Sequence, residues 1–372
     1  MRVKIRKEYI SSILRTIIAF IFSLILSGII ILIVGYDPVK AFTALFVTSF
    51  GSIKGFGYAL IKTSPLLFTG MGTAFSLKSG LFNGGAEGSF LLGAAMGTWA
   101  GVTFTNLPPF LLVPFTLFCG AIGGGLWALI PSYLRAKYRV SELITTIMFN
   151  FIAMRLVGYL VKGPLQETRG ILPQSEKISK NVILPFILPG SKLHLGFLIG
   201  ILFAVILYII LFKTYFGYEM RAVGFNSLAA KNEGINVKKL IIIVMVISGS
   251  VCGIGGAVEI TGVAYRLFEG ISTDYGMTAI VIAILANSNP LAIIIVAFLF
   301  GALNAGATAM QRVAGVPGVV VRIFQGTMVI FLIASTKLPL DKLKAKTKRY
   351  IAKRKARRIA REKLTMSKGG EQ

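Results

Sequence analysis

The sequence contains few of the residues on which metal sites and disulfide scaffolds depend. Among its 372 residues are two cysteines, one histidine and 14 acidic residues. Cys119 and Cys252 both fall inside apolar runs, which is typical of buried cysteines that pack as small hydrophobes. No group of cysteines and histidines has the spacing of a metal site. A metalloprotein and a disulfide-stabilised domain are therefore both disfavoured.

The common catalytic motifs are also absent. The sequence has no G-x-x-x-x-G-K-[ST], no G-x-S-x-G and no H-E-x-x-H pattern. Asp37, Asp274 and Asp341 stand far apart, whereas enzymes that bind diphosphates through Mg²⁺ need clustered aspartates. We therefore expect no enzymatic activity, no cofactor and no ATP site in this chain.

What the sequence has in abundance is apolar residues in long runs. It is 55% hydrophobic and 15% charged, with a mean hydropathy of +0.77. Residues 17–34 form a run of roughly 18 residues without a charge, enough to span a bilayer. A cleaved signal peptide is the alternative for this run, but no small-residue cleavage site follows it. The sequence predicts an all-α polytopic membrane protein.

The apolar runs and the turn-like pieces between them predict about ten transmembrane helices. The predicted spans are 15–35, 58–77, 81–104, 109–131, 142–162, 194–213, 240–263, 274–288, 290–310 and 319–336. Five spans precede the long 163–193 loop and five follow it, which suggests two five-helix halves of inverted topology.

The basic residues set the expected orientation. The net charge is +26, and two basic ends, 1–14 and 337–372, flank the transmembrane domain 15–336. Basic segments beside membrane spans stay cytoplasmic and contact anionic lipids. Nucleic-acid binding is the alternative, but it needs a folded basic face that the sequence lacks. We expect cytoplasmic termini, with the basic 132–142 loop also inside.

Several polar residues lie within or beside the predicted spans. A charge at bilayer depth costs at least about 2.5 kcal/mol, so such residues face the bundle interior. They either line a hydrophilic solute's path or only join helices by hydrogen bonds. The segment 82–89, FNGGAEGS, would also weaken a helix and predicts a broken helix beside such a path. The candidate pathway residues are Asn83, Glu87, Asn150, Arg155, Glu259, Asn287 and Asn304.

A short polar stretch, 218–240, interrupts the apolar pattern inside the predicted 214–239 loop. Asn226 or Ser227 is suited to cap a helix, and Gly234 to end it in the left-handed conformation. The stretch therefore predicts a two-turn helix over 227–233. A helix this short is marginal in water, so we expect it to pack on another surface, in this chain or in a partner.

This stretch, MRAVGFNSLAAKNEGINVKKL, resembles the cytoplasmic loop of bacterial ABC importer permeases of the branched-chain amino acid, simple sugar and nucleoside group. GLFNGGAEGSFLLGA (80–94) is similar to the nucleoside branch, with departures at Gly85 and Ser89. LRAKYRVSELITTIMFNFIA (134–153) and NSNPLAIIIVAFLFGAL (287–303) are further matches in the same order. The resemblance implies that one set of residues couples the chain to an ATPase: Arg221, Ala222, Gly224, Asn226, Ala229, Ala230 and Gly234.

The resemblance also implies the setting in which the chain works. It implies a bacterial cell-membrane permease paired with a second permease subunit, as a homodimer or with a sister chain. Two ATPase subunits would hold ATP and Mg²⁺, and an extracytoplasmic solute-binding protein would deliver the solute. The expected solute is a nucleoside, with a simple sugar as the alternative. An ion-coupled secondary carrier is the alternative class, since Glu87 and Glu259 are acidic groups suited to ion coupling.

Overall fold

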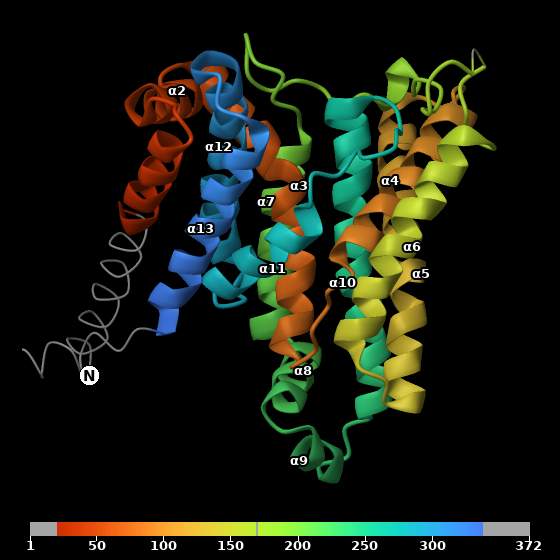
Figure 1. Cartoon of the computed structure of the whole chain (residues 1–372). Helices are drawn as coiled ribbons and strands as arrows, with labels where there is room; N and C mark the ends of the chain where they lie inside the picture. Colours follow the sequence, from red (N-terminus) through yellow and green to blue (C-terminus); the bar gives the residue numbers. More distant parts are fainter. Residues whose placement is uncertain (1–20, 169, 338–372) are drawn as a thin grey trace, which may run out of the picture. The chain divides into compact units, whose positions relative to one another are not determined.

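The regular elements of the protein are helices throughout the described part of the chain. A computed structural model describes residues 21–168 and 170–337 (Figure 1). The chain divides into two compact units, one comprising Ile31–Val321 and the other comprising Met1–Ile30 with Arg322–Gln372. The predicted basic ends, 1–14 and 337–372, lie outside the described residues apart from Lys337. The polar sites discussed below all belong to the unit Ile31–Val321.

The helices follow one another with mostly short connections, apart from the long 163–195 segment. In chain order they are a helix at Ile21–Ile33, α2 (Pro38–Phe50), α3 (Ile53–Lys78), α4 (Ala86–Thr103), α5 (Pro109–Tyr138), α6 (Glu142–Lys162), a 3₁₀ turn at Lys180–Val182, α7 (Gly196–Lys213), α8 (Tyr215–Phe225), α9 (Ser227–Asn232), α10 (Val237–Glu259), a π-helical turn at Ile260–Ala264, α11 (Tyr275–Leu285), α12 (Pro290–Ala314) and α13 (Gly318–Lys337).

Five of these helices are long and apolar enough to cross a bilayer. They are α5, α6, α7, α12 and the continuous helix Val237–Ala264, in which α10 runs on into the π-helical turn. A sixth crossing results if α2 and α3, which meet at an angle of 87°, form one bent span. The all-α polytopic class is therefore confirmed, while the predicted number of ten spans is not.

Two sequence predictions about helix bounds are wrong. The predicted span 274–288 is the short helix α11, whose 11 residues reach about 17 Å, against a hydrocarbon core of about 30 Å. Left-handed residues bound it, with Asp274 before it and Asn287 after it. The predicted loop 132–142 is helical as far as Tyr138, and Arg139 ends α5 in the left-handed conformation.

Glycines allow α10 to pack closely on α4 and α5. A Cβ at Gly253 of α10 would overlap the carbonyl of Gly120 and the backbone of Gly124, both on α5. A Cβ at Gly93 of α4 would overlap the backbone of Gly253. Hydrophobicity does not drive helices together in lipid, so the van der Waals packing of such closely spaced backbones holds these helices together instead.

The main helix contacts form two corresponding sets. Helix α10 packs chiefly on α5 and α4, while α3 packs chiefly on α12 and α10 and less on α11. Helices α3 and α10 also contact each other and so join the two sets. The bundle is thus built around the α3–α10 pair.

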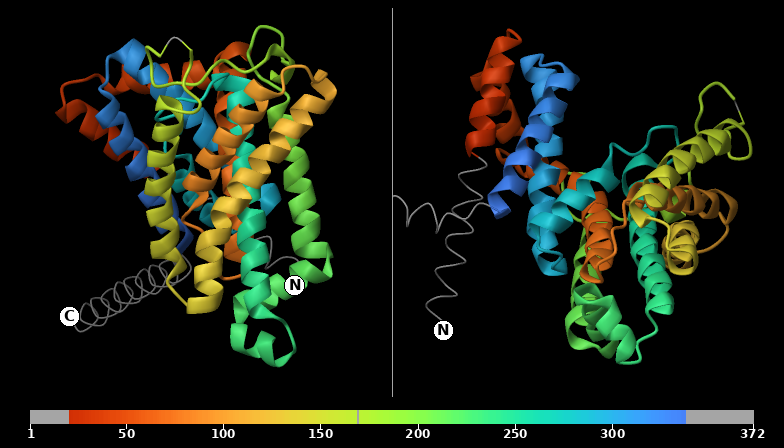
Figure 2. Two further views of the ribbon diagram at one scale, coloured as in Figure 1. Left: turned by 90° about the vertical axis from the view of Figure 1, so that its right-hand side faces the viewer. Right: turned by 60° about the horizontal axis from the view of Figure 1, so that its bottom comes forward.

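The two ends of this bundle differ in structure. Helices α8 and α9 project from one end, and the segment 163–193 covers the opposite end (Figures 1 and 2). Backbone hydrogen bonds attach this segment to the turn after α10: Ser175 N–H donates to the Leu267 carbonyl at 2.7 Å and Leu184 N–H to the Thr261 carbonyl at 3.1 Å. The 163–193 segment is therefore fixed to the end of the α10 helix.

Ion pairs reinforce this attachment. Arg266 pairs with Glu167 at 3.3 Å, and Lys162 pairs with Glu269 at 2.6 Å. The hydrogen bond and charge of Lys162 hold the pKa of the Glu269 carboxyl below its usual range. The Lys162–Glu269 pair lies in solvent, so we expect it to position the loop more than to stabilise the fold.

We predict that Gly253→Ala destabilises the bundle, because the new methyl group would overlap backbone atoms of α5 that cannot move aside. Overpacking of this kind costs about 1–3 kcal/mol. The measurement is thermal unfolding of the purified protein in detergent. Gly326→Ala on α13 is the control, since no atom lies within 4 Å of a Cβ there. Equal unfolding temperatures for the two variants would contradict the packing described here.

Candidate functional site: a helix break and a projecting helix pair

The chain loses helical structure between α3 and α4, inside the bundle. Helix α3 ends at Lys78 and α4 begins at Ala86, so the irregular part is 79–85 and residues 86–89 are already helical. Most of this segment is buried, including Asn83, Gly84 and Gly85. Asn83 contacts Ser248, which lies near the middle of the Val237–Ala264 helix. The predicted break is thus confirmed, with slightly shifted bounds. It lies beside the middle of the membrane-spanning helix Val237–Ala264.

Buried amide side chains hydrogen-bond to the freed backbone groups. Asn150 of α6 accepts a hydrogen bond from Gly88 N–H at 2.8 Å and donates to the Gly84 carbonyl at 2.7 Å. Asn83 accepts from Gly85 N–H at 2.9 Å and donates to the Ser248 hydroxyl at 2.8 Å. Irregular backbone at this depth is tolerated only when its polar groups are satisfied in this way.

Glu87 joins the starts of α4 and α11. It lies in the first turn of α4, and its Oε2 accepts a hydrogen bond from Gly276 N–H, in the first turn of α11, at 2.6 Å. A Cβ at Gly276 would overlap the backbone of Glu87, so the two helix starts are in direct contact. A carboxylate between two helix N-termini is favourable because both carry partial positive charge.

A second polar cluster adjoins this contact, and the sequence analysis recognised only part of it. Glu259 ends α10, and Lys62 of α3 interacts with it electrostatically. The Lys62 ammonium lies 5.8 Å from the centre of the Tyr58 ring. Tyr275, which begins α11, interacts electrostatically with Glu259 and packs edge-on against Phe90 at 5.4 Å. Lys62 is the one charge within the predicted span 58–77, which is the signal that would have identified it.

The other predicted pathway residues do not join these clusters. Arg155 is exposed on α6, and Asn287 is exposed in the left-handed turn before α12. Asn304 is partly buried within α12, where its carbonyl accepts a hydrogen bond from the Thr308 hydroxyl at 3.1 Å. The structure thus brings together Asn83, Glu87 and Asn150, and it links Glu259 to Glu87 through Tyr275.

The polar loop 214–239 holds two helices rather than one. The predicted two-turn helix is α9, six residues long, and Asn226 caps it by accepting hydrogen bonds from Leu228 and Ala229 N–H groups. Gly234 follows in the left-handed conformation with a φ of 88°. The sequence did not predict α8, which precedes it.

Helix α8 is anchored to the bundle. The Arg221 guanidinium donates a hydrogen bond to the Leu211 carbonyl at the end of α7 and lies 5.5 Å from the Phe212 ring centre. Gly224 lies so close to the α3 terminus that a Cβ there would overlap the Lys78 carbonyl. Gly80 is left-handed, with a φ of 74°, and a Cβ on it would approach the Gly224 backbone at 3.2 Å. Helix α8 therefore touches the first residues of the break.

The tip formed by α8 and α9 exposes large apolar side chains. Phe225 is 92% exposed and Leu228 is 73% exposed, whereas Ala230 is 4% exposed and packs inward. Ala222 is partly buried and Ala229 is exposed. Of the predicted coupling residues, Arg221 and Gly224 thus bind the tip to the bundle, Asn226 and Gly234 shape α9, and Ala229 faces outward.

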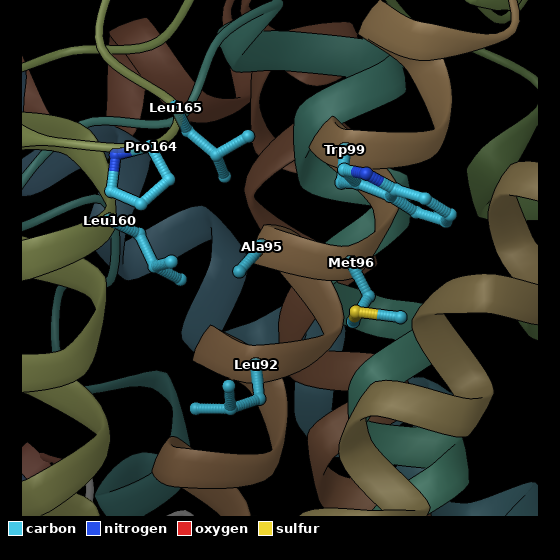
Figure 3. A pocket seen from close by; sticks show the side chains of 7 residues that line it. All are labelled: Leu92, Ala95, Met96, Trp99, Leu160, Pro164 and Leu165. Carbon is cyan, nitrogen blue, oxygen red and sulfur yellow. The ribbon is translucent and has the colours of Figure 1, made fainter.

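A lateral pocket of about 260 Å³ lies between α4 and the end of α6 (Figure 3). Leu92, Met96 and Trp99 of α4 and Leu160 of α6 line it, together with Pro164. An apolar lining does not suit a hydrophilic solute. The polar candidates for a solute path are therefore the clusters at Glu87 and Glu259.

Long apolar helices, a helix break held by buried amides and an anchored, exposed helical tip are together the features of an all-α membrane transport subunit. The chain belongs to the family described as branched-chain amino acid transport system / permease component, whose model matches residues 55–333. This confirms the family resemblance and supports the assignment of the chain to a multi-pass membrane protein.

Individual relatives cover most of the chain. It is 35% identical to the guanosine ABC transporter permease protein NupP of Bacillus subtilis over 91% of this chain and 98% of the relative. It is 34% identical to the glucose ABC transporter permease protein TsgB13 of Haloferax volcanii, over 84% and 85% of the two chains. It is 32% identical to the nucleoside ABC transporter permease protein NupB of Lactococcus lactis subsp. cremoris, over 85% and 89%.

We predict that Asn150→Ala destabilises the break, because it leaves Gly88 N–H and the Gly84 carbonyl buried without partners. Each such group costs about 1–3 kcal/mol. The measurement is the unfolding temperature in detergent, together with amide exchange of 79–88. Asn232→Ala, at the exposed end of α9, is the control and should leave both unchanged. Unaltered exchange in Asn150→Ala would show that the amide does not hold this segment.

Proposed function

We propose that this chain is the permease subunit of an ATP-binding cassette importer for nucleosides. A separate ATPase drives alternating access of the solute path. The observation that carries the proposal is the anchored tip with exposed Phe225 and Leu228, in a chain of this permease family. It also agrees with a sequence that contains no ATP-binding motif.

The tip suits docking on an ATPase. Two large apolar side chains at the end of a polar projection offer an anchor for a hydrophobic groove, the usual form of helix recognition. The seven residues that the resemblance assigns to coupling fall in or beside this tip. In the proposal, Phe225, Leu228 and Ala229 touch the ATPase, while Arg221 and Gly224 hold α8 on the bundle.

The contact at Gly224 supplies a route from the tip to the solute path. A displacement of α8 presses on the Lys78 carbonyl and on Gly80, at the start of the 79–85 break. The break leads directly to Glu87 and its hydrogen bond with the first turn of α11. Movement of the tip thereby changes the contact between the first turns of α4 and α11.

The paired helix contacts support two inverted halves. If α3 corresponds to α10, then α4 corresponds to α11 and α5 to α12, and the contacts α3–α12 and α10–α5 become equivalent. Both halves then contain a helix that begins inside the bundle, α4 in one half and the shorter α11 in the other. We propose ten helices inserted in the membrane, among them the short α11, which reaches only part of the way across, with both termini in the cytoplasm beside anionic lipid.

The proposed partners follow from the two ends of the bundle. ATPase subunits dock at the α8–α9 end, on the cytoplasmic side. An extracytoplasmic solute-binding protein docks at the opposite end, over the 163–193 segment. A second permease subunit, identical or a sister chain, completes the pathway. ATP and Mg²⁺ belong to the ATPase.

The relatives favour a nucleoside as the solute. Two of those reported are named for guanosine or nucleosides, and the residues 80–94 resemble the nucleoside branch. A simple sugar is the second candidate, because a relative of nearly equal identity is named for glucose. The ion-coupled carrier becomes less favoured, since these relatives are named as ABC transporter permeases.

Reconstitution of the whole transporter tests the function. We predict that proteoliposomes with this permease, its ATPase and its solute-binding protein accumulate guanosine when ATP is present. Liposomes with the permease alone should not take up guanosine under a proton or sodium gradient. Uptake by the permease alone would refute the importer, and accumulation of glucose without guanosine would favour the sugar candidate.

We predict that Leu228→Asp weakens association with the ATPase, because it places a charge where an apolar anchor must be desolvated. Loss of a central interface anchor costs about 2 kcal/mol or more. The measurement is the amount of ATPase that co-purifies with the permease. Leu228→Met is the matched control and should retain association. Normal co-purification of the Asp variant would remove Leu228 from the docking surface.

A further inference from the structure

Glu259 is a buried carboxylate whose hydrogen-bonding capacity is unused. Its exposed fraction is 5%, and no described residue donates a hydrogen bond to it or forms an ion pair with it within 4 Å. Glu87, by contrast, accepts hydrogen bonds from Gly276 N–H and from the Ser272 side chain. A buried carboxylate normally accepts hydrogen bonds, so the free acceptors of Glu259 are available to a molecule from outside the chain.

The backbone at Glu259 is also unusual. The α-helix changes there into the π-helical turn Ile260–Ala264, and Tyr265 follows with a φ of 60°. Single π-helical turns occur frequently at functional sites, because they redirect side chains within a helix. Glu259 lies five residues, about 8 Å, before the end of the Val237–Ala264 helix. It is therefore placed in the part of the bundle nearer the 163–193 segment.

The groups around Glu259 come from the helices that meet at the bundle centre. Lys62 and Tyr58 belong to α3, and Tyr275 belongs to α11, next to the Glu87–Gly276 contact. Asp274 and Glu87 are the other charged groups in this neighbourhood. Aromatic rings, one carboxylate and one ammonium make a set suited to a solute that has both a flat ring and hydrogen-bond donors.

We propose that Glu259, Lys62, Tyr58 and Tyr275 form a contact site for the solute within the permease itself. The Glu259 carboxylate accepts hydrogen bonds from hydroxyl or ring N–H groups of a neutral nucleoside, and the partly buried Tyr58 ring lies against its base. Tyr275, buried against Phe90, supports the site from behind. Lys62 balances the charge of Glu259 when the site is empty. The inference rests on the proposed function and identifies where the moving solute touches this chain.

The proposed site lies where a movement of the break would reach a passing solute. It borders the start of α11, which the Glu87 hydrogen bond ties to the end of the 79–85 break. A shift of the break therefore changes the site as well as the Glu87 contact. Each nucleoside that passes the site would exchange hydrogen bonds with water for hydrogen bonds with Glu259. Movement of α11 would then break the bonds with Glu259.

The test compares Glu259→Gln, Glu259→Gln with Lys62→Met, and Glu142→Gln in the complete reconstituted transporter. Glutamine keeps the size of glutamate, and the double variant removes the pair of charges together. Glu142 pairs with Arg135 near the end of α5, so Glu142→Gln makes the same chemical change away from the site. Guanosine uptake is measured at saturating loaded binding protein, beside basal ATPase activity and complex assembly.

We expect Glu259→Gln to assemble with its partners, and Glu142→Gln to assemble and to keep both its basal ATPase activity and its guanosine uptake. The maximal guanosine uptake of Glu259→Gln should fall about tenfold, the usual effect of losing a hydrogen bond to a charged group. The double variant should stay impaired, because charge balance alone does not replace the carboxylate. Unchanged uptake in Glu259→Gln, or recovery in the double variant, would overturn the site and leave only a charge pair. A wild-type transporter that takes up no guanosine would instead refute the proposed nucleoside function.

Discussion

The hydrogen bonds of Asn150 to the backbone of the α3–α4 break are the interaction on which the rest of the arrangement depends. Lipid offers no partner for a free N–H or carbonyl, so a chain that leaves helical structure inside a bilayer must satisfy those groups internally. Asn150 serves Gly84 and Gly88 together, and Asn83 serves Gly85. Only with these groups satisfied does α4 start inside the bundle, where Glu87 reaches α11.

The same constraint explains why polar residues near the membrane centre have different tasks. Asn83 and Asn150 both hydrogen-bond to backbone groups of the break, so their first role is to hold an irregular segment. Glu87 uses its carboxylate to join two helix starts. Glu259 alone among these has no described donor, which is why it, rather than the asparagines, is the stronger candidate for contact with a passing solute.

Much of the fold was accessible from the sequence because its signals are local. Apolar runs identified α5, α6, α7, α10 and α12, and the capping residue Asn226 with Gly234 identified α9. The glycines and asparagine of 82–85 identified the break. The length of α11 was not accessible, because its apolar run resembles a span and only the left-handed residues at its ends shorten it.

The candidate site was less accessible, because it depends on contacts between distant residues. No local pattern indicates that Arg155 and Asn287 are exposed while Glu87 contacts Gly276, 189 positions away. Tyr275 was missed because it looks ordinary in its own segment, whereas Lys62 could have been identified as the one charge within the predicted span 58–77. Phe225 and Leu228 are not among the coupling residues that the resemblance implies, whereas Ala230, which is one of them, packs inward.

Amide hydrogen exchange of the assembled transporter tests the central claim most directly, because it reports the break residue by residue. The structure predicts that the amides of Gly85, Gly88 and Gly276 exchange as slowly as those of the buried middle of α3, since each has a buried acceptor. If they exchange as fast as the amides of the exposed 226–234 segment, the break is not held by Asn83, Asn150 and Glu87.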